Sequence, residues 1–127
     1  MRELILLIED DELIRSNLFE LLELEDFNVI GAEDGLVGLI SAKEFQPDLI
    51  VCDINMPQLD GYEVLRYLRA DSRTAKIPFI FLTSETAPES RSRAEEMGAN
   101  DYLIKPVQIE KILKVIRINL KSQKIEV

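Results

Sequence analysis

Five short apolar segments alternate along the chain with segments whose apolar residues recur at helical spacing. The predicted strands are Leu4–Ile8, Asn28–Ala32, Leu49–Cys52, Pro78–Leu82 and Tyr102–Ile104. Short, mostly apolar strands are typical of a sheet that is covered on both faces. Consecutive strands that are joined through helices pair in parallel, with right-handed crossovers. The sequence therefore predicts an α/β fold in which helices cover both faces of a parallel sheet.

The first three helices show their starts and their inward faces in the sequence. Asp11 and Asp34 are placed to cap the first and second helices, and Asp60 or Gly61 opens the third. The residues expected to face the core are Ile14, Leu18, Leu21 and Leu22, then Leu36, Leu39 and Ile40, then Val64, Leu65 and Leu68. Each set forms an apolar stripe that would pack against the sheet.

The last two helices differ in character. The fourth is expected over about Pro88–Met97, with Gly98 where helices accept a left-handed residue, and Pro106 precedes the fifth. In the fifth helix the expected inward stripe is Ile109, Ile112, Leu113, Ile116 and Leu120. The aliphatic residues expected on its other side are Val107, Val115 and Ile118. The basic residues expected on a solvated face are Lys111, Lys114, Arg117, Lys121 and Lys124. Exposed aliphatic residues on a basic helix indicate a contact surface for a partner or a dimer.

Length and charge limit what kind of protein this is. The chain has 127 residues, 46% of them hydrophobic, which suits a single domain over residues 1–127 with no output domain. Its net charge is −9, and residues 1–60 hold 15 acidic but only 3 basic residues, which argues against direct binding of nucleic acid. No apolar stretch reaches the roughly 20 residues that cross a bilayer, so we expect a cytoplasmic chain with no membrane partner. The lone Cys52 is expected to be a buried, small apolar residue.

Charged residues directly follow three of the predicted strands. Glu9 and Asp10 follow the first strand, Asp53 the third and Lys105 the fifth. In open α/β sheets, ligands bind at the carboxyl ends of the strands, where these side chains would meet. Two carboxylates 4 Å apart repel by about 4 kcal/mol at an effective dielectric constant near 20, so the cluster favours a hard cation such as Mg²⁺. With Lys105 opposite the metal and the Thr83 hydroxyl nearby, this arrangement suits phosphoryl transfer to Asp53.

The chain resembles the receiver domain of two-component response regulators from Leu4 to about Leu120. The matching segments are Glu9-Asp10-Asp11, Asp53 with Met56-Pro57 and Asp60-Gly61, Thr83-Ser84, Gly98-Ala99 and Lys105-Pro106. Each segment alone is weak, but the set in this order and spacing is specific. The resemblance implies a flavodoxin-like, doubly wound fold with five helices and five parallel strands in the order 2-1-3-4-5. It also implies a cis peptide bond between Lys105 and Pro106.

The resemblance implies a role for each residue of the charged cluster. Asp53 would be the phosphoacceptor, and Asp10 and Asp53 would bind Mg²⁺ (or Mn²⁺) directly. Glu9 would hold the metal through water, and the backbone carbonyl of Asn55 would complete the protein ligands. Lys105 would bind the phosphoryl group.

Further residues would carry the response and its reversal. By the resemblance, Thr83 is the switch hydroxyl and Tyr102 the aromatic residue that moves with it into the space that the hydroxyl leaves. Asn55 and Glu85 each stand two residues beyond a site residue, and with Ser84 they would position the phosphoryl group or the hydrolytic water. The phosphorylated state is therefore expected to decay by itself.

The implied function is that of a signalling switch in a two-component phosphorelay, and not of an enzyme acting on other substrates. A histidine kinase or a histidine phosphotransfer protein would donate the phosphoryl group. The fourth helix, fifth strand and fifth helix would then present a changed surface to a downstream effector or to a dimer partner.

Three other functions compete with this interpretation. A phosphatase of the haloacid dehalogenase type needs a second Asp at position 55, where this chain has Asn55. A flavodoxin-like mononucleotide binder needs a Ser, Thr and Gly loop after the first strand, where carboxylates would repel phosphate. The third alternative, a receiver-shaped interaction module that is never phosphorylated, is compatible with the sequence. For Asp11, a helix cap and a place in the outer metal shell are both possible.

Overall fold

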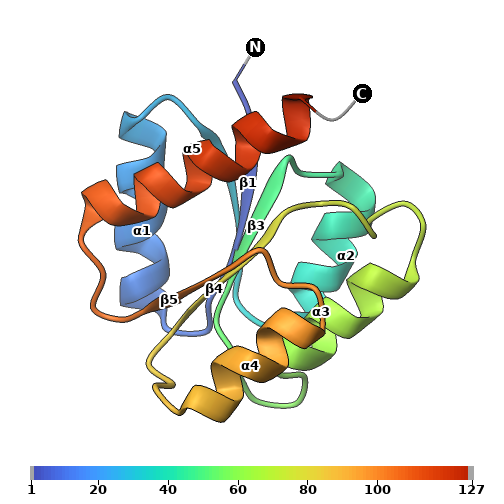
Figure 1. The fold of residues 1–127 in the computed structure, drawn as a ribbon. Helices are drawn as coiled ribbons and strands as arrows, with labels where there is room; N and C mark the ends of the chain where they lie inside the picture. Colours follow the sequence, from blue (N-terminus) through green and yellow to red (C-terminus); the bar gives the residue numbers. More distant parts are fainter. Residues whose placement is uncertain (1, 126–127) are drawn as a thin grey trace.

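The computed structural model describes residues 2–125, so Met1, Glu126 and Val127 lie outside the described part of the chain. Five parallel strands form one sheet in the order β2-β1-β3-β4-β5 (Figure 1). In chain order the elements are β1 (Leu4–Ile8), α1 (Glu12–Leu24), β2 (Asn28–Ala32), α2 (Gly35–Phe45), β3 (Leu49–Cys52), α3 (Gly61–Ala70), β4 (Phe79–Thr83), α4 (Pro88–Glu96), β5 (Asp101–Ile104) and α5 (Ile109–Ile125). The predicted fold class and strand order are confirmed. Of the strand bounds, β4 lies one residue later than predicted, and β5 starts one residue earlier.

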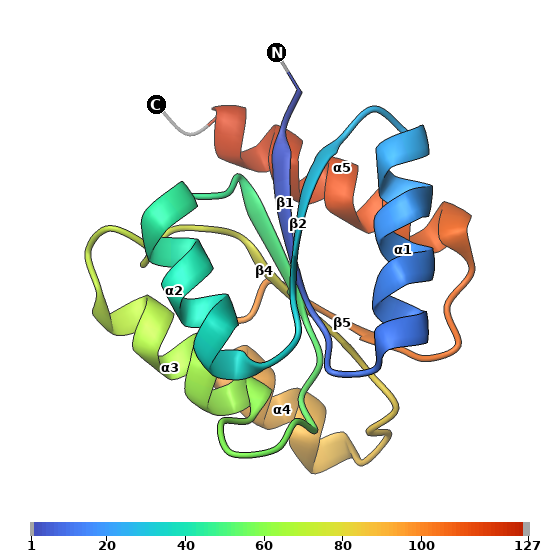
Figure 2. The ribbon, with the colours of Figure 1, turned by 180° about the vertical axis from the view of Figure 1, so that it is seen from behind.

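The sheet separates two hydrophobic cores, one on each face. Helices α1 and α5 lie on one side, and α2, α3 and α4 on the other (Figure 2). Along β1, Ile5 and Leu7 belong to the core with α1 and α5, whereas Leu6 and Ile8 belong to the core with α2, α3 and α4. All four are at most 1% exposed, because both faces of the strand are covered.

Aspartate side chains cap the starts of three helices. The side chains of Asp11, Asp34 and Asp60 each accept a hydrogen bond from the backbone N–H three residues on, at 2.8–3.0 Å. Asp60 is therefore the cap of α3, and Gly61 is its first residue. Gly98 follows α4 with φ = +97°, as its predicted role requires. These caps satisfy free N–H groups at the helix starts.

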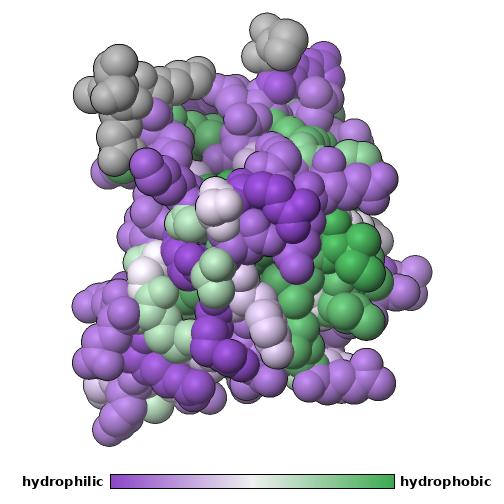
Figure 3. Space-filling model, turned by 90° about the vertical axis from the view of Figure 1, so that its right-hand side faces the viewer, coloured by the Kyte–Doolittle hydropathy of each residue, from purple (hydrophilic) through white to green (hydrophobic). Residues whose placement is uncertain are grey.

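Helix α2 turns a face of small residues to the sheet, and the predicted face is wrong. Leu36 and Ile40 are 59% and 56% exposed, and of the expected set only Leu39 is buried. The buried residues of α2 are Gly35, Gly38, Leu39, Ser41 and Ala42. A Cβ on Gly38 would overlap the side chain of Ile8, so the helix lies too close to β1 for large side chains. Hydrophobic residues consequently gather on the surface on the side that carries α2 (Figure 3).

One residue of the predicted α1 stripe is also exposed. Leu18 and Leu22 are buried, but Leu21 is 40% exposed. Leu21 lines an open groove of about 550 Å³ with Ile14 and Val107. It therefore borders a surface groove instead of packing in the core.

Helix α5 packs through the predicted stripe, but its other face is less apolar than predicted. The stripe residues Ile112, Leu113, Ile116 and Leu120 are buried, and Ile109 is partly buried. Val107 and Val115 also pack partly buried against this core, which contradicts their placement on the opposite side. Val107 precedes the helix, so helical spacing does not apply to it, and Val115 borders the stripe. Only Ile118, 53% exposed, stays as predicted. The predicted basic residues Lys111, Lys114, Arg117 and Lys121 are exposed, and the side chain of Lys124 lies outside the described residues.

Two smaller predictions concern burial and membranes. Cys52 is fully buried in β3, as predicted, and its Sγ donates to the backbone carbonyl of Asp53 at 3.1 Å. Between residues 2 and 125, none of the helices has both the length and the apolar composition that a membrane span requires.

Candidate functional site

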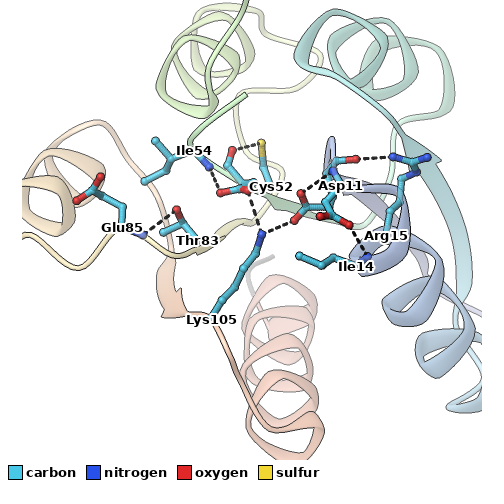
Figure 4. A network of polar contacts seen from close by, with 10 residues as sticks. Asp11, Ile14, Arg15, Cys52, Ile54, Thr83, Glu85 and Lys105 are labelled. Atoms are coloured by element: carbon cyan, nitrogen blue, oxygen red, sulfur yellow. Dashed lines mark hydrogen bonds and ion pairs between the residues drawn. The ribbon is translucent and has the colours of Figure 1, made fainter. Parts of the chain in front are cut away.

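The predicted charged residues meet because neighbouring parallel strands end at the same edge of the sheet. The last residues of β1 and β3, Ile8 and Cys52, are partners in the ladder, so Glu9 and Asp53 emerge side by side. Thr83 at the end of β4 pairs with Ile104, so Lys105 emerges beyond the next strand. In the close view, the Lys105 side chain extends from the end of β5 toward the carboxylates (Figure 4). Residues far apart in the sequence thus form one cluster.

The Lys105 ammonium lies between two buried carboxylates. Its Nζ is 2.5 Å from Glu9 Oε1 and 3.0 Å from Asp53 Oδ2. The side chains are 14%, 4% and 10% exposed respectively, so water screens these ion pairs only weakly. Burial alone would lower the pKa of Lys105, but its hydrogen bonds to Glu9 and Asp53 outweigh this and raise that pKa above its ordinary value. Lys105 therefore stays charged and holds both carboxylates in place.

Glu9 is fixed by several contacts besides the ion pair. Its Oε2 accepts from the backbone N–H of Asp11 at 3.1 Å, and its backbone carbonyl accepts from Arg15 Nη1 at 2.7 Å. Burial raises the pKa of Glu9 above its ordinary value, despite the opposing effect of Lys105. An additional positive charge at this carboxylate would therefore be favourable.

Asp53 presents a carboxylate whose two oxygens have different partners. Oδ1 accepts from the backbone N–H of Ile54 at 2.7 Å, and Oδ2 faces Lys105. The backbone N–H of Asp53 donates to the carbonyl of Ile8 at 3.1 Å, which ties the residue to the end of β1. An oriented carboxylate at the edge of a sheet, next to an ammonium, has the position that a nucleophile toward phosphorus needs.

Three carboxylates can converge on one cation. Oxygens of Glu9, Asp10 and Asp53 all lie within 4.8 Å of one another. Asp10 is exposed and has open coordination positions, whereas the other two are buried. The three carboxylates and the Lys105 ammonium together carry a net negative charge, and the ligand atoms that the carboxylates offer are all oxygens. Both properties fit Mg²⁺ or Mn²⁺.

Asn55, predicted to offer its carbonyl, is exposed in the loop that follows Asp53. Asp11 caps α1, which confirms that interpretation of it.

The predicted switch residues are linked through Glu85. Thr83 is fully buried, and its Oγ1 accepts from the Glu85 N–H at 3.2 Å. The Tyr102 hydroxyl donates to the Glu85 carbonyl at 2.8 Å, and Tyr102 is only 5% exposed. The ring that was expected to move inward is therefore already buried in this structure. Burial raises the pKa of Tyr102 to about 12. Ser84 is exposed, next to Thr83.

Two features complete the site. The Lys105–Pro106 peptide bond is cis, as predicted. Arg15, which binds the Glu9 carbonyl, was not predicted, because its place in the sequence is that of an ordinary polar residue on the exposed side of α1. The first turn of α1 lies next to the loop after β1, and this places the Arg15 side chain at the Glu9 carbonyl.

Comparisons with known proteins agree with this geometry. Residues 5–117 match the family model of the response regulator receiver domain. The DNA-binding dual master transcriptional regulator RpaA of Synechocystis sp. (strain ATCC 27184 / PCC 6803 / Kazusa) is 38% identical over 117 residues, which are 92% of this chain and 48% of RpaA. This chain thus spans about half the length of that relative.

Solved structures are similar over nearly the whole chain. A CheY-like response regulator receiver domain protein from Methanospirillum hungatei JF-1 has a TM-score of 0.94 at 26% identity, covering 100% of both chains. The receiver domain of the sensor histidine kinase PA1611 from Pseudomonas aeruginosa PAO1 has a TM-score of 0.88 at 28% identity, covering 95% of this chain and 99% of that one. The latter structure has a magnesium ion coordinated in the active site cleft.

Proposed function

This chain belongs to the response regulator receiver domain family of two-component signalling, and we propose that it is a phosphorylation switch with Asp53 as the acceptor. One observation carries the proposal: the Asp53 carboxylate is oriented by the Ile54 N–H and by Lys105, beside Glu9 and Asp10. Receiver domains as a class bind Mg²⁺ in an acidic pocket, and the similar receiver domain of PA1611 has a magnesium ion coordinated in its active site cleft. We assign the whole of residues 1–127 to one such domain.

The proposed reaction transfers a phosphoryl group from a phosphohistidine of a kinase or phosphotransfer protein. An Asp53 carboxylate oxygen forms the new O–P bond while the N–P bond breaks, and its electron pair returns to the imidazole, which takes up a proton. When bound, Mg²⁺ would neutralise charge on the phosphoryl oxygens. Asp10, Asp53 and the Asn55 carbonyl would hold it directly, and Glu9 through water.

After the transfer, Lys105 would bind the phosphoryl group, which then carries the negative charge. Its ammonium already lies 3.0 Å from Asp53 Oδ2, so a small rotation of the flexible side chain would bring it to a phosphoryl oxygen on Asp53. This contact is charge-assisted and strong in a poorly solvated site. Lys105 would thus contribute to both the acceptance of the group and the stability of the product.

The signal would pass through Glu85. A phosphoryl oxygen draws the Thr83 hydroxyl away from the Glu85 N–H, and Tyr102 follows because it binds the carbonyl of the same residue. The loop before α4 then moves, and the α4-β5-α5 surface changes for an effector or a dimer partner. Shifting a two-state equilibrium from mostly off to mostly on takes about 5 kcal/mol, which a few charge-assisted contacts can supply.

The same site would reverse the signal. Asn55 and Ser84 are exposed and Glu85 is partly exposed, and each follows closely on Asp53 or Thr83 in the chain; we propose that they orient a water molecule toward the phosphorus. Attack by that water breaks the O–P bond and releases inorganic phosphate with the Asp53 carboxylate. We propose this self-catalysed cycle as the only chemistry of the chain. The cytoplasmic location expected from the sequence stays a prediction.

The test is phosphorylation by a small donor. The chain is incubated with labelled acetyl phosphate with Mg²⁺, with Mn²⁺ or with EDTA, and we expect a metal-dependent, base-labile adduct of one phosphoryl group. Asp53→Asn keeps the shape of the side chain and should abolish labelling, whereas Asp48→Asn, at an exposed aspartate before β3, should not change it. Labelling of Asp53→Asn would refute the assignment. No labelling of the unaltered chain would favour the phosphate-free interaction module.

A further inference from the structure

Helix α4 has few apolar residues that could hold it against the rest of the fold. Its N-cap residue, Ala87, makes no side-chain hydrogen bond to the helix, and Ala94 is its only buried residue. Most of its other residues are charged or polar, so burial of apolar surface contributes little to its docking. Because isolated helices of this length are unstable in water, its position depends on contacts from other elements.

Tyr62 of α3 supplies two such contacts to α4. Its hydroxyl donates to the backbone carbonyl of Ser90 at 2.9 Å. The guanidinium of Arg93 lies over its ring, 4.0 Å from the centroid. Tyr62 itself is only 5% exposed and belongs to the core, so it is a fixed support. Thus one side chain of α3 binds both the backbone and a side chain of α4.

The residue before Tyr62 is in direct contact with the phosphoacceptor loop. The N–H of Gly61 donates to the carbonyl of Ile54 at 2.8 Å. A Cβ on Gly61 would clash with the backbone carbonyl of Asp53, so no space separates the two segments. A displacement of the backbone at Asp53 must therefore move the first turn of α3, and Tyr62 with it.

Tyr62 and Tyr102 are connected through one aromatic ring. The centroid of Phe81 lies 5.5 Å from that of Tyr62 and 6.1 Å from that of Tyr102. Tyr102 binds the Glu85 carbonyl before α4, and Tyr62 binds within the first turns of α4. The two tyrosines therefore hold neighbouring segments, and both pack against the Phe81 ring.

We propose that Tyr62 is a positioning residue of the switch: it holds α4 in the conformation seen here and connects α4 to Asp53 through α3, by a route that does not include the Thr83 hydroxyl. The proposal rests on the proposed function. Because Tyr62 stabilises one of two conformations, loss of its contacts should shift the equilibrium toward the other. Phosphorylation, which shifts the same equilibrium, should then need a different concentration of phosphodonor.

The experiment compares three variants. Tyr62→Phe removes the hydrogen bond to Ser90 and keeps the ring, and Arg93→Ala removes the stacking from the exposed side of α4 without touching the core. Tyr67→Phe is the matched control, because Tyr67 lies on the same helix and is 45% exposed. Hydrogen exchange of residues 86–97 is measured by mass spectrometry without any phosphodonor. The half-saturating concentration of acetyl phosphate is then measured with Mg²⁺.

We expect exchange in residues 86–97 to be about fivefold faster in Tyr62→Phe and about threefold faster in Arg93→Ala, the factors for one hydrogen bond and one cation–π contact. The half-saturating concentration should change by similar factors, and Tyr67→Phe should match the unaltered chain. A purely structural Tyr62 would speed exchange but leave half-saturation unchanged, which would overturn the proposal, as would exchange equal to that of Tyr67→Phe. If the unaltered chain takes up no phosphoryl group, the proposed function fails first and the switch role of Tyr62 falls with it.

Discussion

Removal of the Lys105 ammonium would leave two buried carboxylates without their counterion. Its Nζ lies 2.5 Å from Glu9 Oε1 and 3.0 Å from Asp53 Oδ2. Lys105→Met keeps the apolar stem and approximate length of the side chain, so it deletes the charge with little change in packing. The variant therefore tests how far these ion pairs stabilise the metal-free fold.

The expected loss follows from the geometry. Each contact corresponds to about 6 kcal/mol of Coulomb energy at an effective dielectric constant near 20. The lysine also loses hydration on burial, so the net effect is smaller. Loss of one partner from a buried ion pair typically costs about 3–5 kcal/mol. Because the side chain of Lys105 is 14% exposed, we expect the lower end, about 3 kcal/mol, in EDTA at pH 8.

The loss should depend on pH through Glu9. Burial already raises the pKa of Glu9, and without Lys105 this pKa rises further. A carboxyl whose pKa is higher in the folded than in the unfolded state contributes stability below the unfolded value, and that contribution disappears as the pH rises through the folded value. The loss in free energy of unfolding of Lys105→Met, relative to the unaltered chain, should therefore be smallest near pH 4.5 and should grow toward pH 8.

The assay is urea unfolding followed by circular dichroism at 222 nm, because the chain has no tryptophan. Lys111→Met, at an exposed position on α5, is the control and should lose less than about 0.5 kcal/mol. Saturating Mg²⁺ should restore most of the lost stability, because it replaces the missing positive charge; a hundredfold excess over Kd stabilises by about 2.7 kcal/mol. A deficit below about 1 kcal/mol in EDTA at pH 8, or one that is equal at pH 4.5, would refute the reasoning.

Three further predictions concern single residues. Gly61→Ala should destabilise the chain by about 2 kcal/mol in urea unfolding, because the new Cβ would clash with the Asp53 carbonyl; a gain in stability would show that the loop yields. The Cys52 thiol should react with Ellman's reagent only after unfolding, since it is fully buried, and fast reaction of the folded chain would contradict that burial. Tyr102 has a pKa of about 12 in the folded chain because of burial, so the unfolded tyrosine ionises first as the pH rises. The chain should therefore lose stability between pH 10 and 12, and Tyr102→Phe should lose less when urea unfolding is repeated at pH 9 and 11.

The sequence was sufficient to predict the charged cluster because strand ends are predictable. Short apolar strands ended within one residue of the predicted positions, and parallel pairing then brought Glu9, Asp53 and Lys105 to one edge. Local signals were equally reliable at the helix starts, where Asp11 and Asp34 bind the N–H three residues on. Both kinds of prediction depend on interactions between residues that are close in the sequence or in register.

Helix faces were less predictable, because periodicity identifies where large apolar residues lie but not how closely a helix approaches the sheet. In α2 the close approach to Ile8 leaves no room for a side chain at Gly38, and the helix turns Leu39 inward while Leu36 and Ile40 face outward. Val107 was assigned by helical spacing although the helix begins only at Ile109. In each case, packing between elements decided the outcome.

By its own pattern of apolar and charged residues, the chain determined the alternating strands and helices, the helix caps and the edge at which its acidic residues would gather. Only the tertiary structure decided that Lys105 lies between Glu9 and Asp53, that Arg15 holds the Glu9 carbonyl and that Tyr62 supports α4. The physical reason is that periodicity and capping act over a few residues of chain. Contacts across 52 or 96 residues, by contrast, depend on how closely whole elements pack.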